Sequence, residues 1–365
     1  MRRITTVLLA GVLLLGACGG SESSDNPKDA LIDSIEGLAD LDAATVTVSL
    51  NSTTETLQAM SGESGEMLPT DVADAILNSS LVFSGAGEGD DAVVRVVVNI
   101  DGEESVDLRV VDKVMYVRAD VRGLADRFGA DTSEIDQAAQ EAASFGFDFV
   151  GPLLDGEWLA LDFGVLQEQF GGQLPTPTGG TDQSLKELEA ILRDTAAVSS
   201  EGSDDVGDHL VATVPLRETY QRFLEIADIA AQLPPGATLP DASEVPDESI
   251  ALDVWVDDGQ LRQVELDFLQ FARMAGEEVP EDVEAFALRL AIEDFDGDID
   301  VPADAIEIDL EKLMQDILGG VMGGGLGAPP AGDGATNDPF CQGLEGQPRQ
   351  VLKLYKEQCP DLLKS

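Results

Sequence analysis

A chain of 365 residues with 71 acidic and 21 basic side chains carries a net charge of −50. A surface of this charge repels phosphate backbones, so the composition excludes nucleic acid as a partner. Hydrophobic residues make up 43% of the chain, which is sufficient for a core, whereas aromatic residues make up only 5%.

The first 17 residues are typical of a lipoprotein export signal. A basic start at Arg2 and Arg3 precedes an apolar run, which is shorter than the roughly 20 residues of a membrane-spanning helix. The run ends in LGAC, which matches the lipobox, where small residues suit the signal peptidase and the Cys thiol takes a diacylglyceryl group. We therefore expect the signal peptide 1–17 to be removed and Cys18 to carry palmitate-type chains. This predicts a protein anchored by lipid on the outer face of the cytoplasmic membrane.

Changes in composition divide the mature chain into four parts. Residues 18–26 are polar and short enough, at most about 28 Å, to tether the protein close to the bilayer. Residues 27–317 hold the periodic patterns and form the predicted main domain. Residues 318–336, rich in Gly, Ala and Pro, are a predicted flexible linker. Residues 337–365 form a small separate unit.

Helical patterns begin directly after the tether. Asn26 is suited to cap a helix and Pro27 to occupy its first position, and an apolar stripe of Leu31, Ile35 and Leu38 follows. Residues 120–145 are also predicted to be helical, as are 185–196 and a long helix from about 216 to 233. The candidates for burial in the second of these segments are Leu124, Phe128, Ile135 and Ala139.

Strand patterns occupy much of the rest of the main domain. Apolar and polar residues alternate in ten short segments, which indicates strands with one buried and one wet face. Asp101-Gly102, Asp112-Lys113 and Asp258-Gly259 are turn signals between neighbouring strands. We therefore predict an α+β fold: one large curved antiparallel sheet, a half-barrel of about ten strands, with helices covering its concave face. The expected strands are 45–50, 94–100, 106–110, 114–117, 157–161, 209–214, 250–256, 264–268, 286–292 and 306–308.

The sequence shows no catalytic constellation. The chain has a single histidine, His209, and no nucleophile elbow or phosphate-binding loop. Residues 294–300 resemble the front of a calcium loop, but Ile299 stands where that loop needs Gly and Ala305 where it needs Glu. We therefore predict a protein that is not an enzyme and has no cofactor and no metal site.

The C-terminal unit contains the two remaining cysteines, Cys341 and Cys359. In an oxidising compartment such a pair most simply forms a disulfide. The unit has equal numbers of acidic and basic residues beside a very acidic chain. Two interpretations stay open: a docking element for another envelope protein, or a stapled tail with no role.

The order of these elements resembles the LppX/LprG-type lipoproteins of actinobacteria and, more distantly, the LolA/LolB-like carriers and the sensor RseB. The matching pieces are the lipobox, the first helix, "VTVSL", "LRVVDKVMYVRA", "DGEWLALD", "LDVWVDDGQLRQVELDF" and "VPADAIEIDL". The resemblance covers about residues 28–310. This chain departs from the pattern by its greater length, its helical insertions and its Cys-paired tail.

The resemblance implies a membrane-anchored carrier or chaperone that binds an acyl-chain lipid or a lipoglycan between the sheet and its helices. Two alternatives remain open: an RseB-like sensor or adaptor that binds a protein, and a structural lipoprotein with a solid core. Tyr220 and Phe223 are candidates for the mouth or lid of the cavity. The expected lining is Val94, Val96, Val98, Leu252, Val254, Val256, Leu266, Leu288 and Leu290.

Overall fold

A computed structural model describes residues 26–38, 41–62, 67–87, 91–144, 146–162, 181–225, 241–276, 278–279, 283 and 285–309. The chain divides into two compact units, Met1–Leu313 and Met314–Ser365, and every described residue belongs to the first. The predictions for the signal peptide, for Cys18, for the linker 318–336 and for the unit 337–365 with Cys341 and Cys359 lie outside the described residues. The same is true of the tether 18–26 except for its last residue.

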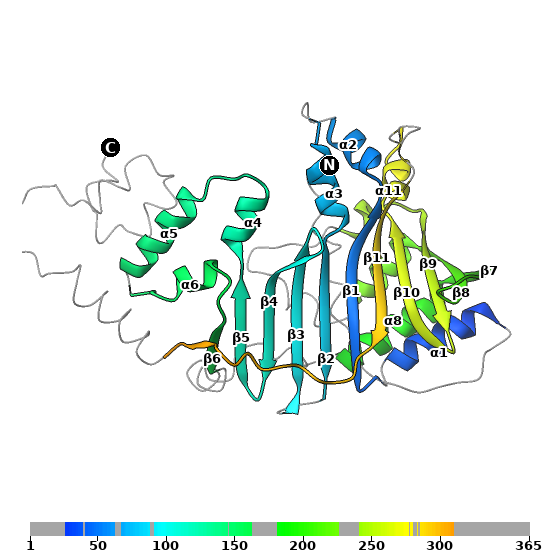
Figure 1. The fold of residues 1–365 in the computed structure, drawn as a ribbon. Coiled ribbons are helices and arrows are strands. Elements are labelled where there is room, and N and C mark those ends of the chain that lie inside the picture. The colour runs from blue at the N-terminus through cyan, green and yellow to red at the C-terminus, as the bar shows by residue number, and fades with distance from the viewer. Residues whose placement is uncertain are drawn as a thin grey trace, which may run out of the picture. The chain divides into compact units, whose positions relative to one another are not determined.

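One twelve-stranded sheet forms the centre of the first unit (Figure 1). Its strands follow the order β12-β6-β5-β4-β3-β2-β1-β11-β10-β9-β8-β7. All neighbours are antiparallel except β12 and β6, which are parallel. The strands are β1 (Ala43–Ser52), β2 (Ser80–Ala86), β3 (Val93–Ile100), β4 (Glu103–Val111), β5 (Val114–Ala119), β6 (Leu159–Asp162), β7 (Ala197–Ser203), β8 (Asp208–Pro215), β9 (Ser249–Asp257), β10 (Gln260–Asp267), β11 (Phe286–Asp294) and β12 (Ile306–Glu307).

Helices are inserted between the strands at several points of the chain. Between β1 and β2, and again between β10 and β11, the connection contains helices at the same end of the sheet (Figure 1). The described helices are α1 (Pro27–Leu38), α2 (Thr54–Gly62), α3 (Thr70–Leu77), α4 (Val121–Arg127), α5 (Ser133–Ser144), α6 (Val150–Leu154), α8 (Thr181–Thr195), α9 (Leu216–Glu225), the 3-10 helix η3 (Ala242–Glu244) and α11 (Leu269–Met274).

Residues that the sequence marks as helix caps and turns adopt those conformations in the structure. The Asn26 carboxamide oxygen accepts a hydrogen bond of 3.1 Å from the Lys28 amide, as a helix cap does. The predicted two-residue turns adopt positive φ angles, such as 55° at Asp101 and 75° at Gly102. These angles belong to the hairpin turns that match the twist of a sheet. They fix β3–β4, β4–β5 and β9–β10 as adjacent antiparallel pairs.

The predicted fold class is confirmed: the chain is α+β, with a single large open sheet and helices. The strand number was underestimated, because β2 and β7 were not among the ten expected strands. The region 120–145 forms two helices, α4 and α5, instead of one continuous segment. The prediction that Phe128 is buried was wrong. That residue follows the last turn of α4 and is 41% exposed, whereas Ala139 of α5 is buried.

The predicted long helix after Pro215 is described as α9 as far as Glu225, and its expected continuation lies outside the described residues. Among the helices that the structure describes, none has the length and apolar character needed to cross a bilayer.

Candidate functional site

One face of the sheet is apolar across the strands between its two edges, β7 and β12. Residues paired across antiparallel strands point to the same face, so the register traces continuous rows of side chains. One row crosses the sheet from β11 to β6 through Ile292, Val46, Phe83, Val96, Leu108, Val117 and Leu159. A second runs from β8 to β5 through Leu210, Val254, Val264, Leu290, Val48, Leu81, Val98, Val106 and Ala119.

Three helices close one half of this apolar face. We call strands β7–β11 and β1 the helix-covered half, because α1, α8 and α9 pack there against β7–β10. Their apolar residues join those of the strands in one core cluster, in which Leu210 and Val254 are each only 3% exposed. The Lys28 ammonium, which donates to the Ala196 carbonyl at 2.7 Å, links α1 to the end of α8.

The other half keeps the same apolar pattern but is less deeply buried. We call strands β2–β6 the outer half. Its apolar-face residues on β2–β5, among them Phe83, Val96, Leu108 and Val117, are partly exposed. Helix α6 packs beside β5, and Leu159 on β6 is 1% exposed. Among the described residues, the apolar face of the outer half is therefore less deeply buried than the centre of the helix-covered half.

All nine strand residues predicted to line a cavity lie on the apolar face. Val94, Val96 and Val98 belong to the outer half, on β3, and are partly exposed. The other six lie on β9, β10 and β11, where Val254 and Val256 are part of the core cluster. These six are Leu252, Val254, Val256, Leu266, Leu288 and Leu290.

The two predicted mouth residues belong to α9. Tyr220 is 8% exposed, and burial, with some help from the nearby acids Asp241 and Glu244, raises the pKa of its phenol. The side chain of Phe223 lies outside the described part of the chain.

Sequence reasoning missed several residues of the outer half. Leu81 and Phe83 lie on β2, which was not predicted, and Leu108 and Val117 lie on predicted strands but were not assigned to the lining. The available signal was the recurrence of large apolar residues at every second position, the same signal that identified Val94, Val96 and Val98. Pairing of the strands, which the sequence does not state, brings them together.

The opposite face of the outer half is polar and carries a buried ionic network. The side chain of Asp107 is fully buried, and it accepts hydrogen bonds of 2.8 Å from the guanidinium groups of Arg95 and Arg109. Burial opposes the charge on Asp107, but the hydrogen bonds and positive charges of the two arginines outweigh burial and lower the pKa of its carboxyl. Glu104 extends the network by pairing with Arg95 and Arg118.

A second polar cluster surrounds the single histidine on β8. The His209 ring stacks on Trp255 with centroids 4.5 Å apart, and its Nε2 lies 2.8 Å from an Asp253 oxygen. The Trp255 indole donates to Asp204 at 2.8 Å, and this hydrogen bond lowers the pKa of the Asp204 carboxyl. Within the described ranges, no group of three or more His, Cys, Asp or Glu side chains is arranged to hold a metal ion.

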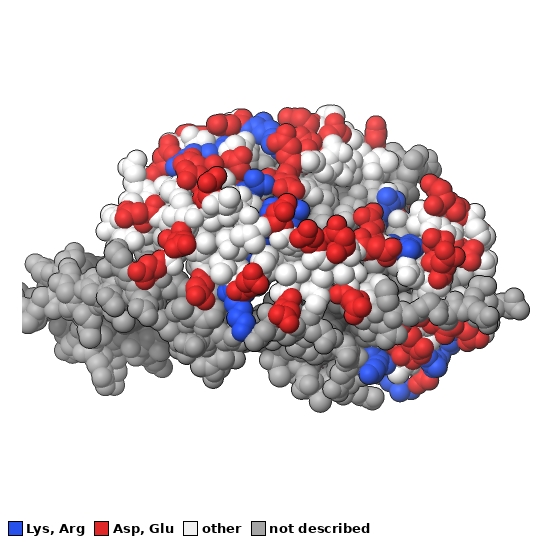
Figure 2. Space-filling view, turned by 60° about the horizontal axis from the view of Figure 1, so that its bottom comes forward, with Lys and Arg blue, Asp and Glu red and all other residues white. Residues whose placement is uncertain are grey.

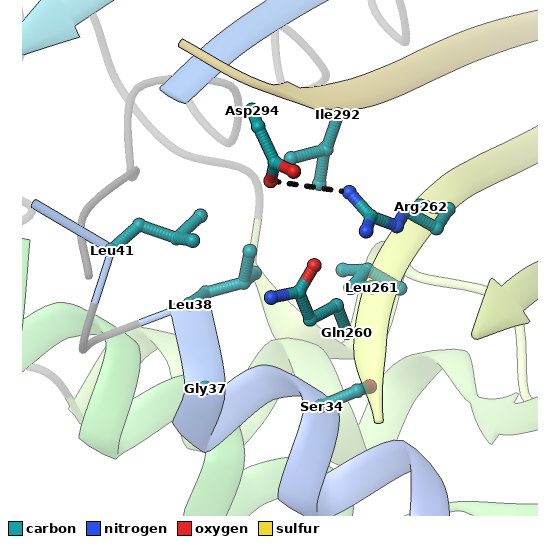
Figure 3. A pocket seen from close by; sticks show the side chains of 9 residues that line it. All are labelled: Ser34, Gly37, Leu38, Leu41, Gln260, Leu261, Arg262, Ile292 and Asp294. Atoms are coloured by element: carbon teal, nitrogen blue, oxygen red, sulfur yellow. Dashed lines mark hydrogen bonds and ion pairs between the residues drawn. The ribbon is translucent and has the colours of Figure 1, made fainter. Parts of the chain in front are cut away.

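A small pocket lies where the end of α1 meets β10 and β11 (Figure 3). Leu38, Leu41 and Leu261 form its apolar side, and the ion pair between Arg262 and Asp294 borders it at 3.3 Å. Its volume is about 10 Å³, enough for one water molecule. It is far too small for an acyl chain, so the partly exposed outer half is the better candidate for a binding surface.

No family model and no curated protein matches this sequence. Among solved structures, the crystal structure of the Mycobacterium tuberculosis lipoprotein LppX is similar to the chain. The two proteins are 11% identical, the match covers 77% of this chain and 100% of LppX, and the TM-score is 0.32. A solved structure of the lipoprotein type that the sequence resembles is thus found, but a similarity at this TM-score assigns no ligand to the chain.

Proposed function

We propose that this protein is a membrane-anchored, non-enzymatic carrier or chaperone that binds the acyl chains of an envelope lipid or lipoglycan. The observation that carries the proposal is the outer half of the sheet. There, a continuous apolar face extends past α1, α8 and α9, with Phe83, Val96 and Leu108 partly exposed. A surface of this kind in a protein of such high charge is typical of a binding site for an apolar ligand.

Hydrocarbon burial provides the driving force for binding to such a face. Each fully buried methylene group contributes about 0.8 kcal/mol, so a chain of 16 carbons gains roughly 12 kcal/mol when enclosed and roughly half of that when only one side is covered, before the cost of ordering it. The apolar residues of β3 run from Val94 to Ile100, which at about 3.3 Å per residue is a stretch of roughly 20 Å. No catalytic residue is needed for this function.

The predicted anchor supports the proposal because it would hold the folded unit at a membrane that contains lipid. A lipidated Cys18 holds the protein at the outer face of the cytoplasmic membrane, and the short tether keeps the folded unit close to the headgroups. Acyl chains therefore travel only a short distance between the bilayer and the sheet. The same anchoring suits the second candidate, an RseB-like adaptor, in which a partner protein would cover the same outer half.

Native mass spectrometry of the full-length protein after mild detergent extraction tests the proposal. We expect masses of bound lipid in the wild type and their loss in Val96→Asp, which puts a charge on the apolar face. Val93→Asp is the matched control, because Val93 lies on the same strand, is also partly exposed, and points to the opposite face.

Two results would contradict the proposal: apo protein in several independent wild-type preparations, or lipid retained by Val96→Asp. A wild type that is free of lipid but holds a defined protein through the outer half would establish the adaptor instead.

A further inference from the structure

After β11 the chain returns across the polar face of the sheet as a single extended segment. Residues 295–305 connect the end of β11, in the helix-covered half, to β12, which pairs with β6 at the far edge (Figure 1, orange). The segment passes in front of β2–β5, on the side away from α8 (Figure 1). We call this segment together with β12, residues 295–307, the strap, because it joins the two halves of the sheet.

Few contacts hold the strap in place. Ile299 is its buried side chain, at 8% exposed, whereas Val301 is 49% exposed. The Asp300 carbonyl accepts a hydrogen bond of 2.6 Å from Nη1 of Arg109. At the end of the strap the Ile306 amide donates to the Trp158 carbonyl at 2.8 Å.

Arg109 connects the strap to the sheet through three different contacts. Its guanidinium holds the strap carbonyl, pairs with the fully buried carboxylate of Asp107, and lies over the Trp158 ring at 4.7 Å from the centroid. Arg95 binds the same Asp107 carboxylate, but its other partner is Glu104, on β4. The described hydrogen bonds of Arg95 all go to β4, whereas Arg109 also binds the strap carbonyl, so Arg95 serves as a matched control.

Electrostatic repulsion between acidic side chains weakens the attachment of the strap to the rest of the chain. Asp296, Asp298, Asp300 and Asp304 are exposed along it, in a chain whose net charge is −50. Figure 2 shows acidic side chains spread widely over this side of the molecule. Like charges repel, so the exposed acids of the strap weaken its attachment, whereas the hydrogen bond from Arg109 strengthens it.

We propose that the strap is a releasable clasp, clamped by Arg109, whose release uncovers the edge of β6 and loosens the outer half of the sheet. Short segments with few buried contacts open locally at a much lower free energy than the surrounding sheet. In sequence, β12 is the last described strand before the second compact unit, Met314–Ser365. β6 is the outermost full strand of the apolar face, and the link from strap release to acyl binding rests on the proposed function.

Hydrogen exchange of the full-length protein tests the clasp without any ligand. We expect the amides of Ile306 and Ile308, which donate to carbonyls of β6 and its flank, to exchange about ten-fold or more faster in Arg109→Ala. Arg95→Ala should change them less than about two-fold. Equal protection of these amides in wild type and Arg109→Ala would overturn the clasp.

A second variant guards against a general loss of folding in Arg109→Ala. Ile306→Pro removes the amide that bonds to Trp158 and leaves the pairing of Asp107 with both arginines intact. In a Trp255→Phe background, where Trp158 is the remaining tryptophan, its emission should shift to the red as water reaches the ring. An unchanged emission in Ile306→Pro would contradict release of the strap.

Exchange of a fluorescent long-chain fatty acid then separates the clasp from the proposed function. We expect Ile306→Pro to release the probe several-fold faster than wild type, because β6 loses its outer support. If the amides open but the wild type never binds the probe, the proposed function fails and the clasp stands. If the probe binds and its release rate is unchanged in the variant, the coupling between clasp and site fails.

Discussion

The two halves of the sheet have the same apolar face but are stabilised in different ways. In the helix-covered half, α1, α8 and α9 bury that face, and Leu210 and Val254 are almost inaccessible. In the outer half the same face is partly exposed, and the strands are held from the opposite side by buried Asp107 and by the strap. A half-sheet secured from its polar face can leave its apolar face available for a ligand.

Replacing the carboxylate at the centre of the polar network should produce the largest effect. Asp107→Asn leaves Arg95 and Arg109 without their shared buried partner, and we expect it to cost about 3–5 kcal/mol of unfolding free energy. Urea denaturation measures the loss. Asp253→Asn is the control, because Asp253 is 37% exposed and pairs with a single histidine. Equal losses in the two variants would contradict the central role of Asp107 in the outer half.

Truncating one leucine in each half of the sheet compares how deeply the two halves of the apolar face are buried. Leu210→Ala empties a site that is 3% exposed, and we expect a loss of about 2–5 kcal/mol. Leu108→Ala removes a partly exposed side chain from the outer half and should cost only about 1 kcal/mol, since less area returns to water. Thermal and urea unfolding of both variants check the difference. A loss for Leu108→Ala as large as for Leu210→Ala would show that the outer face is closed in solution.

The acid stability of the protein should depend on Asp107. Its pKa is lower in the folded chain than the ordinary value of 3.8, so its contribution to stability is fully present above that value. The contribution is lost as the pH falls below 3.8 and through the folded-state pKa. We therefore expect the stability difference between wild type and Asp107→Asn to be constant near neutral pH and to shrink below about pH 4. Urea titrations of both proteins between pH 7 and pH 3 measure this difference in unfolding free energy. A difference that grows as the pH falls would contradict a lowered pKa of Asp107 in the folded chain.

Local signals predicted the elements of this fold well where one residue type fixes the backbone. Asp-Gly turns located the hairpins, and Asn26 with Pro27 located the start of α1. The edge strand β7 escaped prediction because only its first two residues, Ala197 and Val198, are apolar, so it shows no period of two. β2 was also not predicted. Leu81 and Phe83 alternate with serine and valine there, but they are the only two large apolar residues of this strand on the apolar face. Phe128 was misplaced because the apolar stripe continues past the point where α4 ends.

The sequence by itself predicted an export signal, and it determined that this chain has an α+β domain and a sheet with one apolar face, because each of these depends on the order and spacing of neighbouring residues. Only the tertiary structure decided which half of that face the helices bury, and it alone brought Asp107, Arg109, Trp158 and Asp300 together. Asp107 and Arg109 are near neighbours on β4, but Trp158 and Asp300 lie far from them along the chain, and the tertiary structure places all four side by side. A period-two pattern predicts that one face of a strand is apolar. Whether protein or ligand covers that face depends on which distant segments of the chain pack against it.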